Sequence, residues 1–256
     1  ATIASGFAQT EQGIDEFFGK TFYAFQYDPK AIKGVIVKIL RYLYDEKMID
    51  VSGESVTATR FGRRVSELYI DPVSGVIIRD ALQKRPAVLT DLSYFQVIAH
   101  TPDIFPKLRP FSSEMEELAL FVDQHRSEWM FPVPEEWEDH IAYEEFLTEA
   151  KTAWVLRAWI DEATEDGMIE QFRVQPGDLY RVLESARWLL YACHELARLF
   201  GVSKAVFSDL DVVSERIEKG VKAELLPLVR LEGIGRVRAR VLHNAGLKTL
   251  DDLRRA

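Results

Sequence analysis

An arginine and a tryptophan two helical turns apart are the first residues of this sequence whose chemistry suggests a ligand. Arg181 and Trp188 lie in the segment 176–200, PGDLYRVLESARWLLYACHELARLF. At about 100° per residue, their side chains fall within roughly 20° of each other on a helix. A base can stack on an indole or a guanidinium plane without sequence preference, so the pair could form a stacking platform. The alternative is that Trp188 packs under a neighbouring helix, since tryptophan is usually well buried.

The same segment predicts the helix that would carry this pair. Pro176 suits a first helical turn, and Asp178 favours the positive end of the helix dipole. Ten apolar residues recur at helical spacing and form one stripe. The stripe consists of Leu179, Val182, Leu183, Ala186, Leu189, Leu190, Cys193, Leu196, Ala197 and Phe200. Arg181 and Trp188 lie about 150° from its centre, on the face that should be polar.

A candidate phosphate site lies near the end of the chain, in LEGIGRVRARVLHNAG. This stretch follows a short helix and predicts a tight turn and a second helix that ends at Gly246 as its C-cap, which is a helix-hairpin-helix. Gly233 and Gly235 would let a backbone approach closely, and the N–H groups that start the second helix would face a phosphate. Arg236 and Arg238 would add charge without reading a base. The alternative is a plain helical hairpin capped by glycine.

Motifs that could indicate catalysis or a metal fail on spacing. Gly19-Lys20-Thr21 resembles the end of a phosphate-binding P-loop, but Ile14 stands where that loop needs its first glycine. His194-Glu195 lacks the second histidine of a zinc-protease helix. The other histidines are scattered without cysteine partners, so we expect no metal site. We identify no nucleophile–base pair and no catalytic residue.

The N-terminal part predicts helices followed by a small hairpin. A helix begins at Pro29, and two strand-like pieces, Met48–Val51 and Ser55–Ala58, are joined by a short turn. Thr59 can cap the helix that follows. This order predicts a winged helix over residues 1–88. Winged helices serve both DNA binding and protein docking, so the outline alone does not select a function.

The remaining chain predicts helices only. Arg85-Pro86 indicates a boundary, after which a helical bundle is expected over 89–202 and a third, truncated helical unit over 203–256. The predicted bundle helices cover 90–99, 113–128, 139–162, 165–172 and 176–200. The expected fold is therefore mainly α: a winged helix, a helical bundle and a helix-hairpin-helix.

Charge is distributed unevenly along the 256 residues, whose formal net charge is −9. Between Glu114 and Glu149, twelve acidic residues face one arginine, a local charge of −11 that leaves +2 for the rest. From Lys219 to Val241, six basic residues face two acidic ones. Any phosphate contact is therefore expected toward the C-terminal end, and the simplest interpretation of the acidic run is a solvated face.

Composition places the protein in a reducing, soluble environment. The single cysteine fits the cytosol and a packing role. No apolar run approaches the roughly 18–20 residues of a membrane helix, and no signal-peptide pattern is present. The chain opens on Ala1 and stops just after a helix start at Lys248-Thr249, which we interpret as a fragment of a longer protein.

Several longer stretches resemble a known family. GKTFYAFQ, VSELYIDPVSG, LTDLSYFQVIAHTPD, KTAWVLRAWIDEATEDGMIEQFRVQPGDLYRVLESARWLL and LEGIGRVRARVLHNAG closely resemble the C-terminal half of the archaeal HelQ-like DNA helicases, which are Ski-like superfamily-two enzymes. The resemblance implies two RecA-like motor domains, then a winged helix, a helical ratchet bundle and a helix-hairpin-helix, of which this chain resembles the last three. It lacks the P-loop and acidic box of the motor. We therefore expect no cofactor in this segment, with ATP and magnesium bound by the parent enzyme.

The resemblance also implies roles for individual residues. Arg181 and Trp188 match the ratchet-helix pair that contacts bases of the translocating single strand. Four residues match the terminal hairpin that grips the strand after the ratchet: Gly233, Gly235, Arg236 and Arg238. Three arginines of the winged helix could contact duplex DNA or dock against the missing motor: Arg60, Arg63 and Arg64.

Two functional hypotheses follow. The first is the DNA-guiding accessory region of an ATP-dependent 3′→5′ DNA helicase of replication-fork repair. It would bind single-stranded or forked DNA as a monomer, in the cytoplasm and associated with the nucleoid. Without ATPase motifs, enzymatic activity of this segment itself is an open question. The rival is a protein-interaction or regulatory scaffold with no DNA grip, and it predicts a buried Trp188.

Overall fold

The computed structural model describes residues 1–27, 29–84 and 89–255. The chain divides into two compact units, Ala1–Val76 and Ile77–Ala256, and each is described by itself. Helices dominate both, and the strands of the described part form one two-stranded sheet. The mainly α fold class is therefore confirmed. The predicted boundary at Arg85-Pro86 lies outside the described residues, and the three domain ranges stay predictions.

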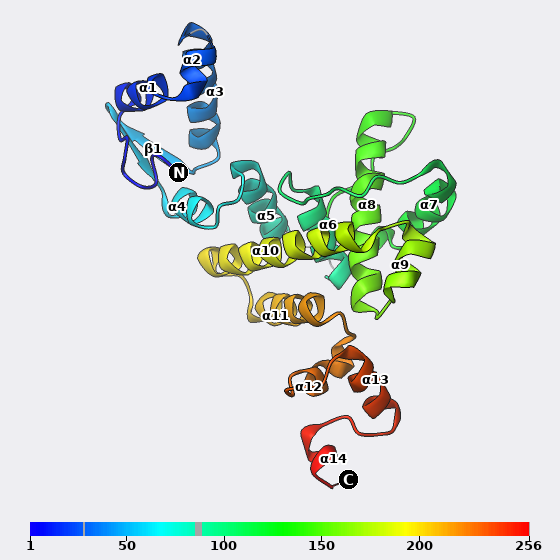
Figure 1. Cartoon of the computed structure of the whole chain (residues 1–256). Coiled ribbons are helices and arrows are strands. Elements are labelled where there is room, and N and C mark those ends of the chain that lie inside the picture. Colours follow the sequence, from blue (N-terminus) through cyan, green and yellow to red (C-terminus); the bar gives the residue numbers. More distant parts are fainter. Residues whose placement is uncertain (28, 85–88, 256) are drawn as a thin grey trace. The chain divides into compact units, whose positions relative to one another are not determined.

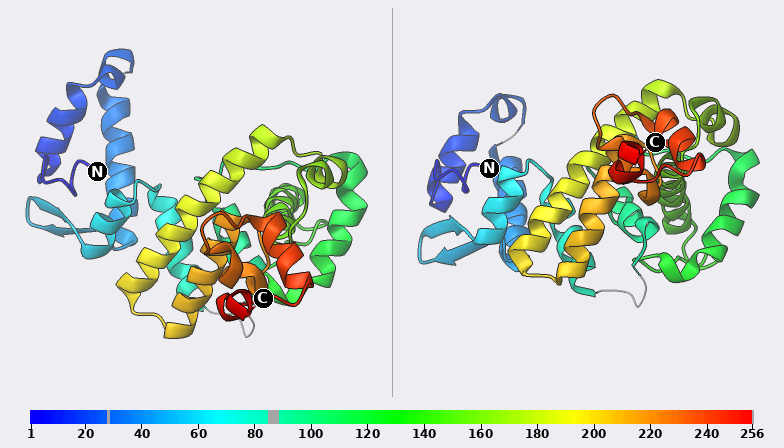
Figure 2. Two further views of the ribbon diagram at one scale, coloured as in Figure 1. Left: turned by 60° about the horizontal axis from the view of Figure 1, so that its bottom comes forward. Right: turned by 90° about the horizontal axis from the view of Figure 1, so that it is seen from below.

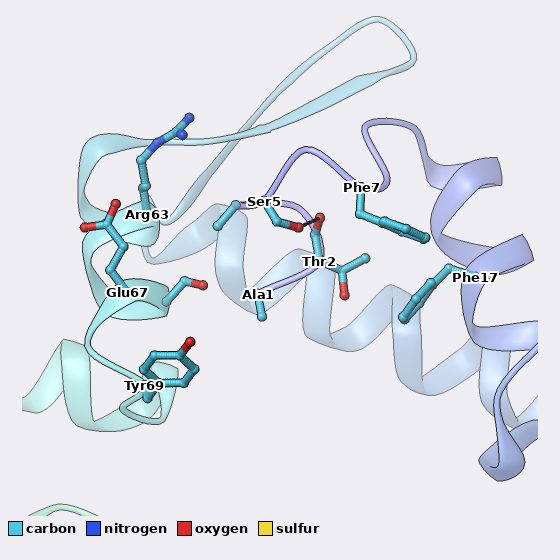
Figure 3. Close-up of a pocket in the computed structure, with 10 residues that line it drawn as sticks. Ala1, Thr2, Ser5, Phe7, Phe17, Arg63, Glu67 and Tyr69 are labelled. Atoms are coloured by element: carbon cyan, nitrogen blue, oxygen red, sulfur yellow. Dashed lines mark hydrogen bonds between the residues drawn. The ribbon is translucent and has the colours of Figure 1, made fainter.

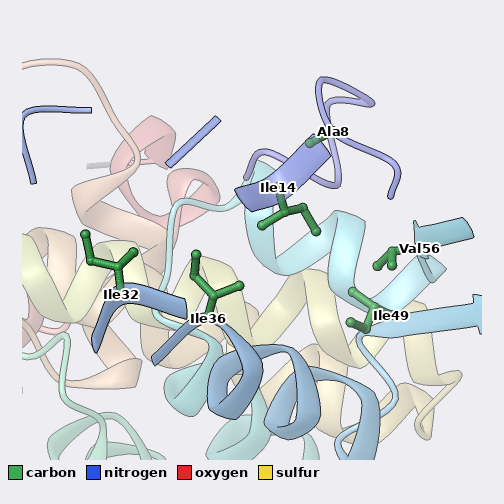
Figure 4. Close-up of a cluster of buried hydrophobic side chains, with 6 residues drawn as sticks. All are labelled: Ala8, Ile14, Ile32, Ile36, Ile49 and Val56. Atoms are coloured by element: carbon green, nitrogen blue, oxygen red, sulfur yellow. The ribbon is translucent and has the colours of Figure 1, made fainter. Parts of the chain in front are cut away.

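The first unit combines helices with a β-hairpin (Figure 1). Its elements are α1 (Glu11–Gly19), α2 (Phe22–Gln26), α3 (Pro29–Asp45), β1 (Ile49–Ser52), β2 (Ser55–Ala58), α4 (Arg60–Glu67) and the start of α5 (Pro72–Lys84). Its apolar core contains the buried side chains of Ala8, Ile14, Ile32, Ile36, Ile49 and Val56 (Figure 4). These residues come from the N-terminal segment, two helices and both strands, so the core is complete only when the hairpin packs on the helices.

The hairpin and the helix after it follow the sequence prediction. The strands pair antiparallel, with Val51 opposite Val56. Thr59 caps α4, since its Oγ1 accepts the N–H of Gly62 at 3.1 Å. The same hydroxyl donates to the carbonyl oxygen of Lys47 at 2.8 Å. One side chain therefore satisfies a free N–H of α4 and ties that helix to the residues before β1.

The second unit is a helical bundle built around α6. Its elements are the rest of α5, then α6 (Asp91–His100), α7 (Met115–Gln124), α8 (His140–Ile160), α9 (Glu165–Phe172), α10 (Pro176–Phe200), α11 (Lys204–Lys219), α12 (Leu226–Val229), α13 (Arg236–Asn244) and α14 (Leu250–Arg255). Helix α6 is buried continuously from Leu92 to Ala99, as expected of a helix at the centre of a core. It packs against α8 and α10, while α10 and α11 lie side by side (Figure 2).

One predicted helix is shorter than expected. The sequence predicts a helix over 113–128, but α7 ends at Gln124, with a 3₁₀ turn on either side. The chain leaves α-helical geometry at His125, whose Nδ1 lies 2.5 Å from Oε1 of Glu128. Glu128 Oε2 also accepts the hydroxyl of Thr90 at 2.6 Å, next to α6. Bonds to a residue distant in sequence thus hold the turn that ends α7.

Candidate nucleic-acid interface

Helix α10 has the amphipathic structure that its sequence predicts. Pro176 occupies the first turn, and Gly201 ends the helix in the left-handed region at φ 62°. Leu183 and Phe200 are half-buried and the rest of the predicted apolar stripe is buried. The buried members are Leu179, Val182, Ala186, Leu189, Leu190, Cys193, Leu196 and Ala197. Burial raises the pKa of the Cys193 thiol to about 12, which fits a packing role rather than reactivity.

Arg181 and Trp188 lie on the opposite face, with different exposure. The Arg181 side chain is exposed and has no hydrogen bond or ion pair with the residues that the structure describes, whereas Trp188 is half-buried. Ser185 lies between them and donates from Oγ to the carbonyl oxygen of Phe105 at 2.9 Å. Phe105 is 64 % exposed. The face defined by Arg181, Ser185 and Trp188 is thus bordered by a loop that brings a second aromatic residue, Phe105, which is exposed and which sequence reasoning missed.

This face is limited to the N-terminal part of α10. Ala192 and Glu195 continue it by helical spacing, yet both are buried. Helix α11 packs along α10, and His194 contacts Asp211 of α11 at 3.2 Å between Nε2 and Oδ1. The surface available to a ligand therefore ends near Trp188.

The turn before α13 has the open backbone that a phosphate site needs. Gly233 has φ 78°, and Gly235 is the N-cap residue of α13. A Cβ atom at either glycine would meet no atom within 4 Å, so the turn is accessible. A cavity of about 570 Å³ lies beside it, and its lining includes both basic and acidic side chains, among them Lys219 and Glu218. The free N–H groups at the start of α13 supply an anion-binding geometry.

The helices α12 and α13 with the turn between them form a helical hairpin, called the terminal hairpin below. Its arginines have different environments. Arg238 is exposed and donates to the carbonyl oxygen of Gly233 at 2.8 Å, so it braces the turn. Arg236 is half-buried, with its guanidinium carbon 4.6 Å from the ring centroid of Trp159. It also donates to the carbonyl oxygen of Ala163 at 3.3 Å. Whether these arginines contact DNA stays a prediction, but in this structure Arg236 attaches the hairpin to the end of α8.

Arg240 completes that attachment, which we call the hairpin joint: Trp159, Glu162, Gly220, Arg236 and Arg240. Its guanidinium donates twice to Glu162, at 2.8 and 2.5 Å, and once to Glu224 at 2.7 Å. Burial by itself would raise the pKa of the Glu162 carboxyl, but hydrogen bonds from Arg240 and the Lys222 N–H hold it below its usual range. The same bonds raise the pKa of Arg240. The joint therefore includes ion pairs that connect α13 to Glu162, two residues after the end of α8.

The other side of the joint is steric. The indole N–H of Trp159 donates to the carbonyl oxygen of Ile217 at 3.0 Å. Gly220 ends α11 at φ 63°, and a Cβ atom there would lie 2.7 Å from two ring carbons of Trp159. Only glycine fits between this ring and the left-handed backbone. The start of the terminal hairpin is thus fixed against α8 by both shape and charge.

The three arginines of the first unit also differ in their surroundings. Arg60 is exposed, and Arg64 pairs with Glu67 at 2.9 Å. Arg63 is exposed and borders a hollow of about 490 Å³ that is lined by aromatic and polar side chains (Figure 3). Phe7, Phe17, Glu67 and Tyr69 are among the lining residues. A hollow with both aromatic and polar walls beside an arginine suits a protein contact as well as DNA, so both interpretations stay open.

The described residues contain neither a candidate metal site nor a candidate membrane-spanning helix. Within them, no group of three or more histidine, cysteine, aspartate or glutamate side chains could hold a metal ion. Among the helices that they form, none is both long and apolar enough to cross a membrane.

Comparison with known proteins defines the class. Residues 92–220, about half of the chain, match the family described as archaeal helicase, domain 4. This region runs from the start of α6 to the end of α11 and contains all of α10. The relatives include three ATP-dependent DNA helicases named Hel308. The Pyrococcus horikoshii protein is 36 % identical over 261 residues, that of Methanocella arvoryzae 34 % over 261, and that of Methanocaldococcus jannaschii 34 % over 252.

These matches assign the family. The alignments cover 100 %, 100 % and 98 % of this chain, and 35 %, 34 % and 19 % of the respective relatives. The chain therefore belongs to the archaeal superfamily-two helicase family. It spans about a third or less of the length of these curated relatives.

Proposed function

We propose that this chain is the non-motor, DNA-guiding part of an ATP-dependent archaeal DNA helicase. A single strand would pass the Arg181–Trp188 face of α10 and then reach the turn before α13. Trp188 and Arg181 would hold bases by stacking, and the backbone N–H groups around Gly235 would hold phosphate. Translocation from 3′ to 5′, action at repair forks and a monomeric, nucleoid-associated state complete the proposal by family resemblance.

The observation that carries this proposal is the exposure of the Arg181–Trp188 face. It lies within the family-matched region, on a helix whose opposite stripe is packed into the core. A partly exposed indole and an unpaired guanidinium on one face can receive a base. The half-buried state of Trp188 also leaves part of its ring in contact with protein, so its removal is expected to lower stability slightly.

The motor is assigned to the rest of such an enzyme. ATP and magnesium would bind there, because this sequence contains no P-loop. We assign the first unit to a winged helix, whose Arg60, Arg63 and Arg64 would contact either duplex DNA or the motor. The hollow beside Arg63, with its aromatic side chains, favours a contact with the motor over a contact with DNA.

The test is binding of a fluorescein-labelled single-stranded oligonucleotide, followed by anisotropy. Trp188→Ala is expected to weaken binding by about 5- to 150-fold, because base–aromatic stacking contributes about 1–3 kcal/mol per base. Arg181→Ala should also weaken it. Arg187→Ala is the matched control, since this exposed arginine lies on α10 about 120° away from Arg181.

Stability must be measured alongside affinity. If Trp188→Ala melts well below the wild type yet binds DNA equally well, the DNA-guiding role is contradicted. That result would support the alternative function, a protein-interaction scaffold. Equal losses of affinity in the Arg181 and Arg187 variants would indicate general electrostatic attraction rather than a specific path.

A further inference from the structure

The start of α8 presents two large apolar side chains to solvent. Trp137, in the turn before the helix, is 80 % exposed, and Ile141, in its first turn, is 71 % exposed. Both therefore lie at the N-terminal end of α8, four residues apart in the sequence. Single exposed apolar residues are common on protein surfaces, but a tryptophan and an isoleucine exposed together at one helix end form a surface of the kind that marks interaction sites.

The backbone that carries this pair is held in place. The N–H groups of Glu138 and Asp139 both donate to the carbonyl oxygen of Glu135, at 3.0 and 3.1 Å. Asp139 then caps α8, since its Oδ1 accepts the N–H of Ala142 at 3.0 Å. Trp137 is thus presented from a defined turn. Because this backbone is already ordered, a partner that binds has to order only the side chain of Trp137, which has two rotatable bonds.

Negative charge surrounds the pair. Six exposed carboxylates lie within eleven residues: Glu135, Glu136, Glu138, Asp139, Glu144 and Glu145. The sequence has no lysine or arginine between Arg126 and Lys151. His140 lies between two of the acids, 3.8 Å from Glu136 and 3.4 Å from Glu144. Such a rim repels nucleic-acid phosphate and attracts cationic groups.

We propose that the face formed by Trp137 and Ile141 is a docking site for a cationic amphipathic segment of a partner protein. The apolar stripe of such a segment would cover the two side chains, and its lysines or arginines would meet the carboxylate rim. The site is separate from the hairpin joint. Trp159 lies at the other end of α8, a helix of 21 residues that spans about 30 Å.

The experiment uses this chain, labelled with ¹⁵N, and observes the indole N–H signals of its tryptophans. The Trp137 signal is assigned by its loss in Trp137→Phe. The probe is a synthetic amphipathic helix of lysine and leucine, about 15 residues long so that it can form a helix. Its addition should shift the Trp137 signal, and raising salt from about 0.05 to about 0.3 M should weaken its binding, because salt screens exposed charges.

Variants separate the apolar contact from general charge attraction. Trp137→Ala should weaken peptide binding about tenfold or more, as expected for an aromatic anchor, and Ile141→Ser should weaken it less. Tyr191→Ala is the matched control, because this side chain is 54 % exposed on α10 and should leave peptide affinity unchanged. Equal affinity for wild type and Trp137→Ala, or no binding at all, would overturn the proposal.

Other occupants give distinguishable outcomes. If single-stranded DNA shifts the Trp137 signal, the face belongs to the DNA path and the docking proposal fails. If light scattering shows a dimer that Trp137→Ala dissociates, the occupant is a second copy of this chain. In that copy, α13 could supply the apolar cationic segment, since Val237 and Val241 are exposed there among arginines. If the peptide binds this chain but not the complete helicase, the occupant is another part of that enzyme. The DNA-guiding role would stand in the last two cases.

Discussion

Gly220 offers a sharp test of the hairpin joint, because the chain contains a matched control. Gly220 and Gly201 end neighbouring helices with nearly the same backbone angle, φ 63° and 62°. A Cβ atom at Gly201 would meet nothing within 4 Å, whereas at Gly220 it would lie 2.7 Å from the Trp159 ring. Substituting each by alanine therefore imposes the same backbone strain but adds a clash at only one position.

The expected magnitudes follow from these contacts. Alanine in the left-handed region costs about 1–2 kcal/mol in both variants. At Gly220 the ring must also move by roughly 1 Å to reach an ordinary carbon–carbon separation. That shift would weaken the Trp159–Ile217 hydrogen bond, about 1 kcal/mol, and the contact with Arg236, about 0.5–1 kcal/mol. We expect Gly220→Ala to be about 2 kcal/mol more destabilising than Gly201→Ala.

Hydrogen exchange of backbone amides, read segment by segment, measures this difference. In Gly220→Ala, amides of α12 and α13 should exchange about 30-fold faster than in Gly201→Ala, while amides of α6 should be similar in both variants. If the amides of α12 and α13 exchange at the same rate in the two variants, the Trp159 ring moves aside without cost. The joint would then not hold these helices as described. An equal acceleration throughout the second unit would mean that the hairpin does not open separately.

Further predictions concern Glu162 in the second unit and two glycines in the first. Glu162→Ala should lower the free energy needed to open α13 by about 1.5–3 kcal/mol, because it removes a largely buried charged partner of Arg240. Glu162→Gly loses the same contacts but relieves the φ of 74°, so it should be less destabilising by up to about 1 kcal/mol; the reverse order would refute the strain argument. Folding lowers the pKa of Glu162. Its contribution to the free energy of unfolding is therefore complete above about pH 5, and it is lost as the pH falls through the lowered pKa. Exchange in α13 should thus accelerate in acid, and less so in Glu162→Ala. In the first unit, thermal unfolding should show Gly34→Ala stabilised by about 0.5–1 kcal/mol, since this helix position is open. Gly62→Ala should be strongly destabilised, because its Cβ would overlap the backbone carbonyl of Met48; equal stability of the two variants would contradict this.

Local patterns predicted much of this structure. The period of the apolar residues in α10 identified the stripe that is buried, and Thr59 was identified as a helix cap from its place before an amphipathic segment. Both signals depend on residues within a few positions of each other, where helix geometry fixes the neighbours.

Contacts between distant residues could not be predicted in this way. Ser185 bonds to Phe105, 80 positions earlier, and Arg240 bonds to Glu162, 78 positions earlier. Ala192, on the face expected to be polar, is buried, and α11 packs along α10. No local period contains such information, since it depends on how separate helices meet.

The same limitation affects the charge argument for DNA binding. Six basic residues between positions 219 and 241 suggested an electrostatic grip. In the structure, Arg230 pairs with Glu215, Arg240 with Glu162, and Lys219 with Glu218, while Arg236 covers Trp159. Lys222 and Arg238 are exposed, and neither forms a side-chain ion pair with the residues that the structure describes. Much of the positive charge therefore holds the hairpin together.

This arrangement makes the salt dependence of single-strand binding informative. Each neutralised phosphate contributes about −0.7 to the slope of log K against log salt, so six hairpin cations would give about −4. Two hairpin cations together with Arg181 predict a slope of about −2. Arg238→Gln should make the slope shallower by about 0.7, whereas Arg230→Gln should leave it unchanged, because that charge is already paired. A wild-type slope of −4 or steeper, reduced equally by both substitutions, would show that the internal ion pairs open to bind DNA and that the joint is not a fixed clamp.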